Sequence, residues 1–390
     1  MGPIIILDKS AFESLSRREQ GFLHKHFLEN LTPILAMELL GDLSKQRGLP
    51  TSPDHWVAGL AGKFGGSGPA TNEDYRTLCV NSMIGVRFPL DSRILPQNVT
   101  PVGGRGRPRG FHIGLSPFNE AIIRWANGDF SELEHQLAGL WRRATENLSV
   151  EALRDQLNGH HVILPHVDQL GDLLATTDTL LGTVTLQDVW LEWLIGQLAL
   201  PREHELLIRL RWRSRGRLLL KGFAPYAWHC LRVLLALVIA TRFELIGWQP
   251  TNLVDVQYLY YLPFCMVFAS NDRLHRVLTP PLLRVDQSFV VGERLKKDLR
   301  RLADDWDRTS EELRAKQSFA LGSYPPPAKN SVVHELWKKH CRPWKPGRGN
   351  LISNLPEPTQ AEAIEEVRAM FQEVEGDEYF TAPEMPPWER

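Results

Sequence analysis

The sequence predicts an α/β protein with a parallel sheet flanked by helices, a large, mostly helical insertion and a C-terminal extension. Three observations lead to this prediction. The β-branched run "PIIILD" opens the chain, and a second apolar run, "PFCMVFASND", covers residues 263–272. Amphipathic helical patterns separate the two runs, and strands that alternate with helices are typical of parallel sheets. The chain has 390 residues, enough for two or three domains or for one domain with a large insertion.

Composition excludes several classes of protein. The apolar fraction of 43%, the charged fraction of 23% and the net charge of −1 are those of a globular protein, and they indicate neither a nucleic-acid nor a membrane partner. Four scattered cysteines form no CxxC pair, which argues against a cysteine zinc site and favours a reducing, cytoplasmic location. The stretch "LRVLLALVIA" (231–240) spans about half of a bilayer crossing, so it predicts a buried helix and no membrane partner.

The first elements follow from local patterns. "PIIILD" predicts a strand that is buried on both faces. Apolar residues from Phe12 to Phe27 recur at helical spacing and predict an amphipathic helix over about 10–29. Thr32 and Pro33 suit the cap and first turn of a helix that runs to Leu43, and this segment could open as a brief strand instead.

The later elements alternate between loops, helices and strands. Glycine- and proline-rich segments predict loops over much of 46–110. "HHVILPHVDQLGDLL" predicts a strand followed by a helix. Helices are expected at 117–158, 186–200, 252–262 and 293–307, in the apolar stretch that ends near residue 242, and directly after Asp272. Strands are expected in the apolar run that ends at Ser270 and at 288–292. We therefore divide the chain into a core (1–45 plus 220–300), an insertion (46–219) and a partly disordered extension (301–390).

Four acids occupy positions from which they could meet. Asp8 and Asp272 each follow a buried strand, and ligands of open parallel sheets bind at the carboxyl ends of the strands. Glu38 and Asp255, on helices next to these strands, can point to the same edge. Converging carboxylates raise one another's pKa unless a cation compensates, and hard divalent ions prefer oxygen ligands. The pattern therefore predicts a site for Mg²⁺ or Mn²⁺.

The segments "IIILDKS", "ILAMELLGD" and "VDVQYLYYLPFCMVFASND" resemble the acidic motifs of the PIN-like nuclease superfamily. The resemblance covers roughly 1–45 and 220–292. It implies a PIN-like sheet and a metal-dependent nuclease, with RNA preferred over DNA. It also implies that the four acids bind the metal and perform catalysis, supported by Ser10 and Asn271. On this interpretation, Asn at position 8 or 272 should abolish cleavage and leave the fold intact.

Simpler explanations exist for each acid taken alone. Asp8, Asp255 and Asp272 could cap helices, and Glu38 could be a solvated helix residue, as could Asp42. Two other functions also remain open. A non-catalytic PIN-like scaffold would bind a protein or nucleic-acid partner through the insertion or the C-terminal extension. A phosphatase or nucleotide hydrolase would use the same four acids on a small substrate.

Two basic segments could position a phosphate backbone. "RLRWRSRGR" (209–217) alternates arginine with other residues, which predicts a strand with one basic face or a solvated edge strand. "GGRGRPRG" predicts a flexible loop that could fold onto nucleic acid, or a plain surface loop. The candidate nucleic-acid-binding residues are Arg105, Arg107, Arg109, Arg211, Arg213, Arg215 and Lys221.

Overall fold

The computed structural model describes residues 2–45, 48–65, 70–102, 110–216, 219–310, 325–326 and 328–341. The chain divides into two units, one of Met1–Leu95 and Pro117–Cys341, the other of Pro96–Ser116 and Arg342–Arg390. In the second unit, the described residues form an antiparallel hairpin of β4 (Val99–Val102) and β5 (Gly110–Ile113). The site and the pocket discussed below both belong to the first unit.

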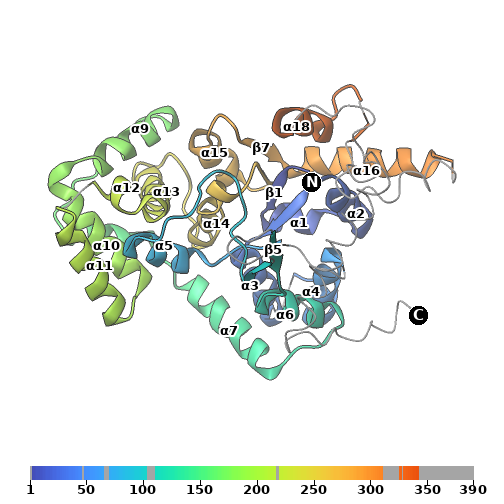
Figure 1. The fold of residues 1–390 in the computed structure, drawn as a ribbon, viewed down its shortest axis with the longest axis horizontal. Coiled ribbons are helices and arrows are strands. Elements are labelled where there is room, and N and C mark those ends of the chain that lie inside the picture. The colour runs from blue at the N-terminus through green and yellow to red at the C-terminus, as the bar shows by residue number, and fades with distance from the viewer. Residues whose placement is uncertain are drawn as a thin grey trace. The chain divides into compact units, whose positions relative to one another are not determined.

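A five-stranded parallel sheet forms the core of the first unit (Figure 1). In order across the sheet, the strands are β3 (Ala70–Thr71), β2 (Leu28–Leu31), β1 (Ile4–Leu7), β6 (Val267–Ser270) and β7 (Ser288–Val291). The first and last predicted core strands pair directly, with Ile5 opposite Val267. Burial on both faces explains why β1 and β6 are continuous apolar runs. The predicted α/β class and these two strands are confirmed.

Helices cover the sheet. Those that follow or precede its strands are α1 (Lys9–Ser14), α2 (Arg17–His26), α3 (Pro33–Gly41), α4 (Pro53–Ala61), α14 (Asn252–Leu259), α15 (Arg273–Leu282), α16 (Gly292–Arg308) and α18 (Val332–His340). Short 3₁₀ turns lie at Asp42–Ser44, Gly62–Phe64, Val184–Leu186 and Leu262–Phe264. Thr32 caps α3 and Pro33 is its first residue, as predicted.

The N-terminal segment differs from the prediction of one helix over 10–29. Ser16 begins a second helix through a capping box with Glu19, so the helix breaks into α1 and α2. Residues Leu28–Leu31 form strand β2. Helical spacing of apolar residues does not reveal such a break, because the spacing continues from one helix into the next.

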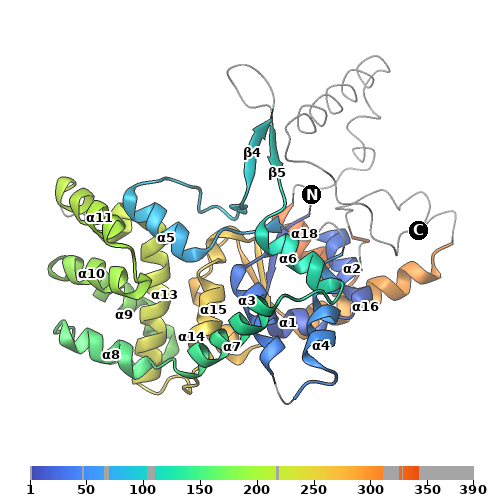
Figure 2. The same ribbon diagram turned by 90° about the horizontal axis from the view of Figure 1, so that it is seen from below.

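The remaining helices are mostly in the predicted insertion. They are α5 (Tyr75–Ile84), α6 (Pro117–Ala126), α7 (Glu132–Glu146), α8 (Val150–Gly159), α9 (Leu170–Leu181), α10 (Gln187–Leu198), α11 (Arg202–Ser214), α12 (Leu220–Phe223) and α13 (Pro225–Arg242). Helices α10 and α11 lie on the side of α13 away from β1 in Figure 1 and away from α15 in Figure 2. Strand β3 also falls in this range, so the sheet draws one strand from it.

Helix α13 is the central helix of this part of the molecule. It packs against α5, α9 and α12, and twelve of its 18 residues are buried. The predicted buried helix at 231–240 is therefore confirmed. No helix in the described part of the chain is both long enough and apolar enough to cross a bilayer. All four cysteines are free thiols.

Two predicted strands are wrong. Residues 209–217 were expected to alternate basic and other side chains along a strand, but Arg209 to Ser214 belong to helix α11. The arginines of this segment therefore spread around a helix. No strand forms between His160 and Asp168; an irregular segment leads into α9. In both places a short pattern fits either period, and packing against neighbouring helices decides the outcome.

Candidate active site

The carboxyl ends of β1 and β6 bring Asp8 and Asp272 to the same edge of the sheet. The backbone N–H of Asp8 donates to Ala269 O at 3.1 Å, which extends the strand pairing by one residue. Asp8 caps α1 and accepts from Ala11 N, whereas Asp272 caps α15 and accepts from Leu274 N at 2.6 Å. The helix-cap explanation is thus correct for both acids, and each cap leaves part of the carboxylate for other contacts.

The Asp8 carboxylate is almost completely buried and is surrounded by donors. Its Oδ1 accepts from Ala11 N at 2.8 Å, and its Oδ2 accepts from Ser270 Oγ at 2.6 Å. The Ser10 hydroxyl lies 2.9 and 2.8 Å from the two oxygens, and His275 Nδ1 lies 3.2 Å from Oδ2. Asp8 therefore has no readily available lone pair for another ligand.

Ser10 and Asn271, the predicted supporting residues, connect the strand ends. Ser10 Oγ accepts from Asn271 N at 3.0 Å, and Asn271 Oδ1 accepts from Glu293 N at 2.8 Å at the start of α16. A Cβ at Gly292 would lie 2.8 Å from Asn271 Oδ1, so this approach requires glycine. These contacts fix β1, β6 and α16 relative to one another.

His275 is the positive group that contacts Asp8. Its Nε2 lies 2.8 Å from the carbonyl oxygen of Asp255, which can only accept. Ser270 donates its proton to Asp8, so His275 Nδ1, 2.8 Å from Ser270 Oγ, must donate as well. Burial alone lowers the pKa of His275, but the hydrogen bond and charge of Asp8 and the contacts with Asp255 outweigh it and raise the pKa to about 9. His275 is therefore an imidazolium at neutral pH.

Asp255 is the acid with the most perturbed environment. It lies in the first turn of α14, whose N-cap is Thr251, so the helix-cap explanation is wrong for this residue. Its side-chain oxygens have no hydrogen-bond or ion-pair partner among the described residues. Burial and the charges of Glu38, Asp272 and Asp8 raise its pKa to about 7, against the opposing effect of His275. The four predicted acids therefore lie close enough to repel one another.

Glu38 reaches the same edge from α3. Its Oε2 accepts a 2.5 Å hydrogen bond from the Tyr258 hydroxyl. Burial raises the pKa of Glu38 most, Lys9 and Tyr258 oppose this, and Asp8 and Asp42 add to it. Lys9 Nζ contacts the Glu38 carbonyl at 3.2 Å and Asp42 Oδ1 at 2.7 Å. Asp42 is itself buried and ion-paired, so the expectation of a surface acid there is wrong.

Several oxygens at this edge are available to a ligand. Glu38 Oε1, Asp272 Oδ2 and both side-chain oxygens of Asp255 make no hydrogen bond within the described ranges. No three His, Cys, Asp or Glu side chains of the described residues are arranged so that they could hold a metal ion as they stand. The site is thus an acidic cluster with one imidazolium, in which three of four carboxylates keep free oxygens.

We expect Tyr258→Phe to destabilise the protein by about 1–3 kcal/mol at pH 8, because it leaves the Glu38 carboxyl group without its donor. The cost should be smaller at low pH, where Glu38 is protonated. Urea unfolding at both pH values measures it. Tyr260→Phe is the matched control, since the Tyr260 hydroxyl makes no hydrogen bond with a described residue. Equal effects of the two variants would contradict a role of the Glu38 contact.

The basic residues predicted to bind nucleic acid lie elsewhere. Arg211 and Arg215 line a pocket between α5, α11 and α13, which shares no residue with the acidic cluster. Arg213 is exposed on α11, and Lys221 lies 4.9 Å from the ring centroid of Trp228. Arg105, Arg107 and Arg109 fall outside the described residues.

Sequence reasoning missed His275, Tyr258, Ser270 and Lys9. Each is adjacent to or within a few residues of a predicted acid, so their positions were a usable signal. His275, for example, lies in the first turn of the helix that Asp272 caps. What the pattern could not show is that these side chains turn toward the acids.

Comparison with known proteins provides no further assignment. No model of a protein family, no curated protein and no solved structure matches this chain. The resemblance inferred from the acidic motifs therefore stays a prediction.

Proposed function

We propose that the chain is a metal-dependent nuclease of the PIN-like type, which hydrolyses phosphodiester bonds at the edge formed by Asp8, Glu38, Asp255 and Asp272. One observation carries the proposal. Asp255 has no partner among the described residues, and burial together with three other carboxylates raises its pKa to about 7. An ionised acid in such surroundings lowers the free energy of unfolding. Groups whose pKa is strongly shifted are concentrated at functional sites.

The residues fit a hard divalent cation in their chemistry. Mg²⁺ and Mn²⁺ prefer carboxylate oxygens, and the free oxygens belong to Glu38, Asp255 and Asp272. These three residues would hold the ion; Asp8 would join them only by giving up one of its present donors. Bound Mg²⁺ or Mn²⁺ would supply a polarised phosphate oxygen and a water of lowered pKa.

The chain's own residues would organise the rest of the reaction. Asp255 would bind the ion as a carboxylate, and its pKa of about 7 without metal means that protons compete with the ion near neutral pH. His275 donates to Asp8 and to the Asp255 carbonyl, and these two hydrogen bonds fix the positions of β1 and α14 relative to one another. Tyr258 fixes the orientation of Glu38. Hydrolysis then adds water across one P–O bond, and the departing oxygen takes up a proton.

RNA is the preferred substrate on the resemblance alone. The test is cleavage of a uniformly labelled single-stranded RNA and of a DNA of the same sequence by purified protein, with Mn²⁺, with Mg²⁺ and with EDTA. The proposal expects cleavage of RNA with either ion and none with EDTA. Release of phosphate from mononucleotides as fast as from polymers would instead identify a nucleotide hydrolase. No metal-dependent cleavage of any of these substrates would reject both enzymes.

Divalent ions should stabilise the protein in a pH-dependent manner. At 100 times its Kd, an ion that binds only the folded state adds about 2.7 kcal/mol, which corresponds to a rise of several degrees in Tm. Protons compete for Asp255 below about pH 7, so the rise should be larger at pH 8 than at pH 5.5. Thermal unfolding with Mn²⁺ measures it. K⁺ at the same ionic strength in place of Mn²⁺ reports general charge screening.

A second candidate function is a non-catalytic scaffold. The observation that favours it is that Asp8 is saturated with donors and His275 already supplies a positive charge, so part of the cluster is satisfied without a metal. A scaffold should show no stabilisation by Mn²⁺ beyond that by K⁺ at the same ionic strength and no cleavage. The two functions therefore give opposite results in the same two experiments.

A further inference from the structure

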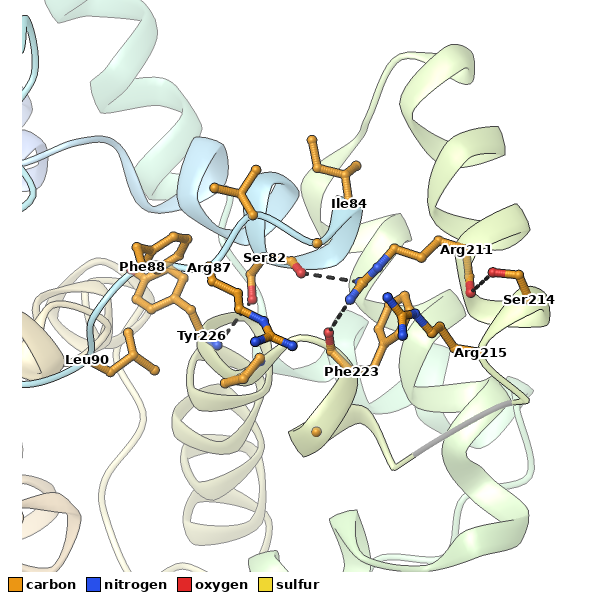
Figure 3. A pocket seen from close by; sticks show the side chains of 14 residues that line it. Ser82, Ile84, Arg87, Phe88, Leu90, Arg211, Ser214, Arg215, Phe223 and Tyr226 are labelled. Atoms are coloured by element: carbon orange, nitrogen blue, oxygen red, sulfur yellow. Dashed lines mark hydrogen bonds between the residues drawn. The ribbon is translucent and has the colours of Figure 1, made fainter. Parts of the chain in front are cut away.

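A basic pocket lies between α5, α11, α12 and α13, apart from the acidic cluster (Figure 3). Its volume is about 740 Å³. Three arginines line it: Arg87 follows α5, Arg211 lies on α11 and Arg215 follows α11. No acidic residue lines the pocket. Arg87 was not among the basic residues singled out from the sequence.

Arg211 is held rigidly. Its guanidinium donates to the Met83 carbonyl at 2.5 Å and lies 4.1 Å from the centroid of the Phe223 ring. It also donates to the Phe223 carbonyl at 3.1 Å (Figure 3). These partners are neutral, so they fix the side chain without cancelling its charge. Gly85 makes this approach possible, since a Cβ there would lie 2.8 Å from Arg211 Nε. Gly85 also adopts a φ of 105°, which favours glycine.

Arg87 and Arg215 have no acidic partner in the described part of the chain, and both are exposed. They lie close enough to Arg211 to affect its titration. Burial, followed by the charges of Arg215 and Arg87, lowers the pKa of Arg211. Three uncompensated cations are therefore gathered around one cavity, where an anion would relieve their repulsion.

The other walls of the pocket are apolar. Phe88, Phe223 and Tyr226 contribute aromatic rings, and Phe88 packs edge-on against Tyr226 with centroids 5.7 Å apart. Ile84 and Val86 expose 36% and 50% of their surface at its rim. Cavities of roughly 300–1,000 Å³ accept small ligands, and guanidinium groups match phosphate oxygens in a bidentate manner. The walls therefore suit a ligand with a phosphate at one end and a flat apolar part at the other.

We propose that this pocket binds a nucleotide, with its phosphate on Arg87, Arg211 and Arg215 and its base against the aromatic wall. The nucleotide is either free or the phosphorylated end of a nucleic-acid strand, since both present the same group. The pocket shares no residue with the acidic cluster, so this inference does not depend on the proposed hydrolysis.

The test is calorimetric titration of the full chain in EDTA, which removes any contribution of metal-bound substrate. The probes are AMP, inorganic phosphate, and an RNA decamer with and without a 5′-phosphate. Arg87→Gln/Arg215→Gln removes the two unpaired charges of the pocket. Arg202→Gln/Arg294→Gln is the matched control, because it also removes two exposed arginines, one on α11 and one on α16, and neither lines the pocket. Circular dichroism verifies that both variants fold.

We expect the double variant to weaken binding at least tenfold and the control to change it less than twofold. Binding of AMP identifies a free nucleotide as the ligand, and binding of the 5′-phosphorylated RNA alone identifies a strand end. If both variants lost binding affinity to the same extent, general charge attraction would explain the binding, and the proposal would be overturned. Inorganic phosphate binding as tightly as AMP would overturn the role of the aromatic wall, and no binding of any probe would overturn the site.

Discussion

Asp255→Asn is expected to lower metal-dependent cleavage of RNA by at least about 100-fold. Asp255 is the acid with free oxygens on both sides of its carboxylate, and its pKa is raised to about 7. An amide keeps its shape but cannot carry the negative charge that holds a cation. Initial rates with saturating Mn²⁺, measured for the variant and the parent protein, test this.

The same substitution should leave the fold intact and stabilise it above neutral pH. The usual carboxyl pKa of 3.8 rises to about 7 in the folded protein, so the unfolded chain ionises first as pH rises. Below about pH 4, Asp255 is protonated in both states and has no effect. Between about pH 4 and 7 it lowers the free energy of unfolding progressively, on the order of 2 kcal/mol after allowance for solvent contact.

Urea unfolding without metal should therefore show that Asp255→Asn lacks this decline between pH 4 and 7. Glu203→Gln is the control, because it removes an exposed carboxylate at the start of α11. It should change neither cleavage nor the pH dependence. If Asp255→Asn cleaved RNA at the parental rate, the proposed site would be wrong, whatever its effect on stability.

Asp8→Asn should destabilise the protein by about 3–5 kcal/mol at pH 7, the cost of breaking a buried charge pair. Asn could still cap α1 with its oxygen, but its amide group would face Ser270 and His275, which both donate to Asp8 in the native protein. This argues against the initial expectation that Asn at position 8 leaves the fold intact. Asp272→Asn is the better variant for testing catalysis, since Asn caps a helix as well as Asp does.

The pH dependence should identify His275 as the partner of Asp8. The pKa of His275 rises from 6.5 to about 9 on folding, so its contribution is fully present below pH 6.5 and is lost as pH rises to about 9. Its size is on the order of 3 kcal/mol. Asp8→Asn should flatten the fall in stability between pH 6.5 and 9, whereas Asp272→Asn should preserve it. A parallel fall in both variants would exclude the Asp8–His275 pair as its cause.

Strands β1 and β6 and helix α13 could be predicted from the sequence because their burial requires long apolar runs. Residues 267–269 are apolar and all four residues of β6 are buried, as expected of a central parallel strand. The two wrong strands, at 160–167 and 209–217, lie where the pattern is short and amphipathic. There, local propensity is weak, and contacts with distant helices decided between helix, strand and irregular chain.

The candidate active site, too, could be predicted from the sequence only in part. The positions of Asp8 and Asp272 at strand ends could be predicted from the sequence, because each acid directly follows a buried strand or the polar residue that ends it. The sequence by itself thus determined an α/β protein with acids at one edge of a parallel sheet. Only the tertiary structure decided that Asp8 is saturated with donors, that His275 is its cation and that Arg87 lines the same pocket as Arg211. Such pairings join residues far apart in the chain, and no local periodicity records which side chains face one another.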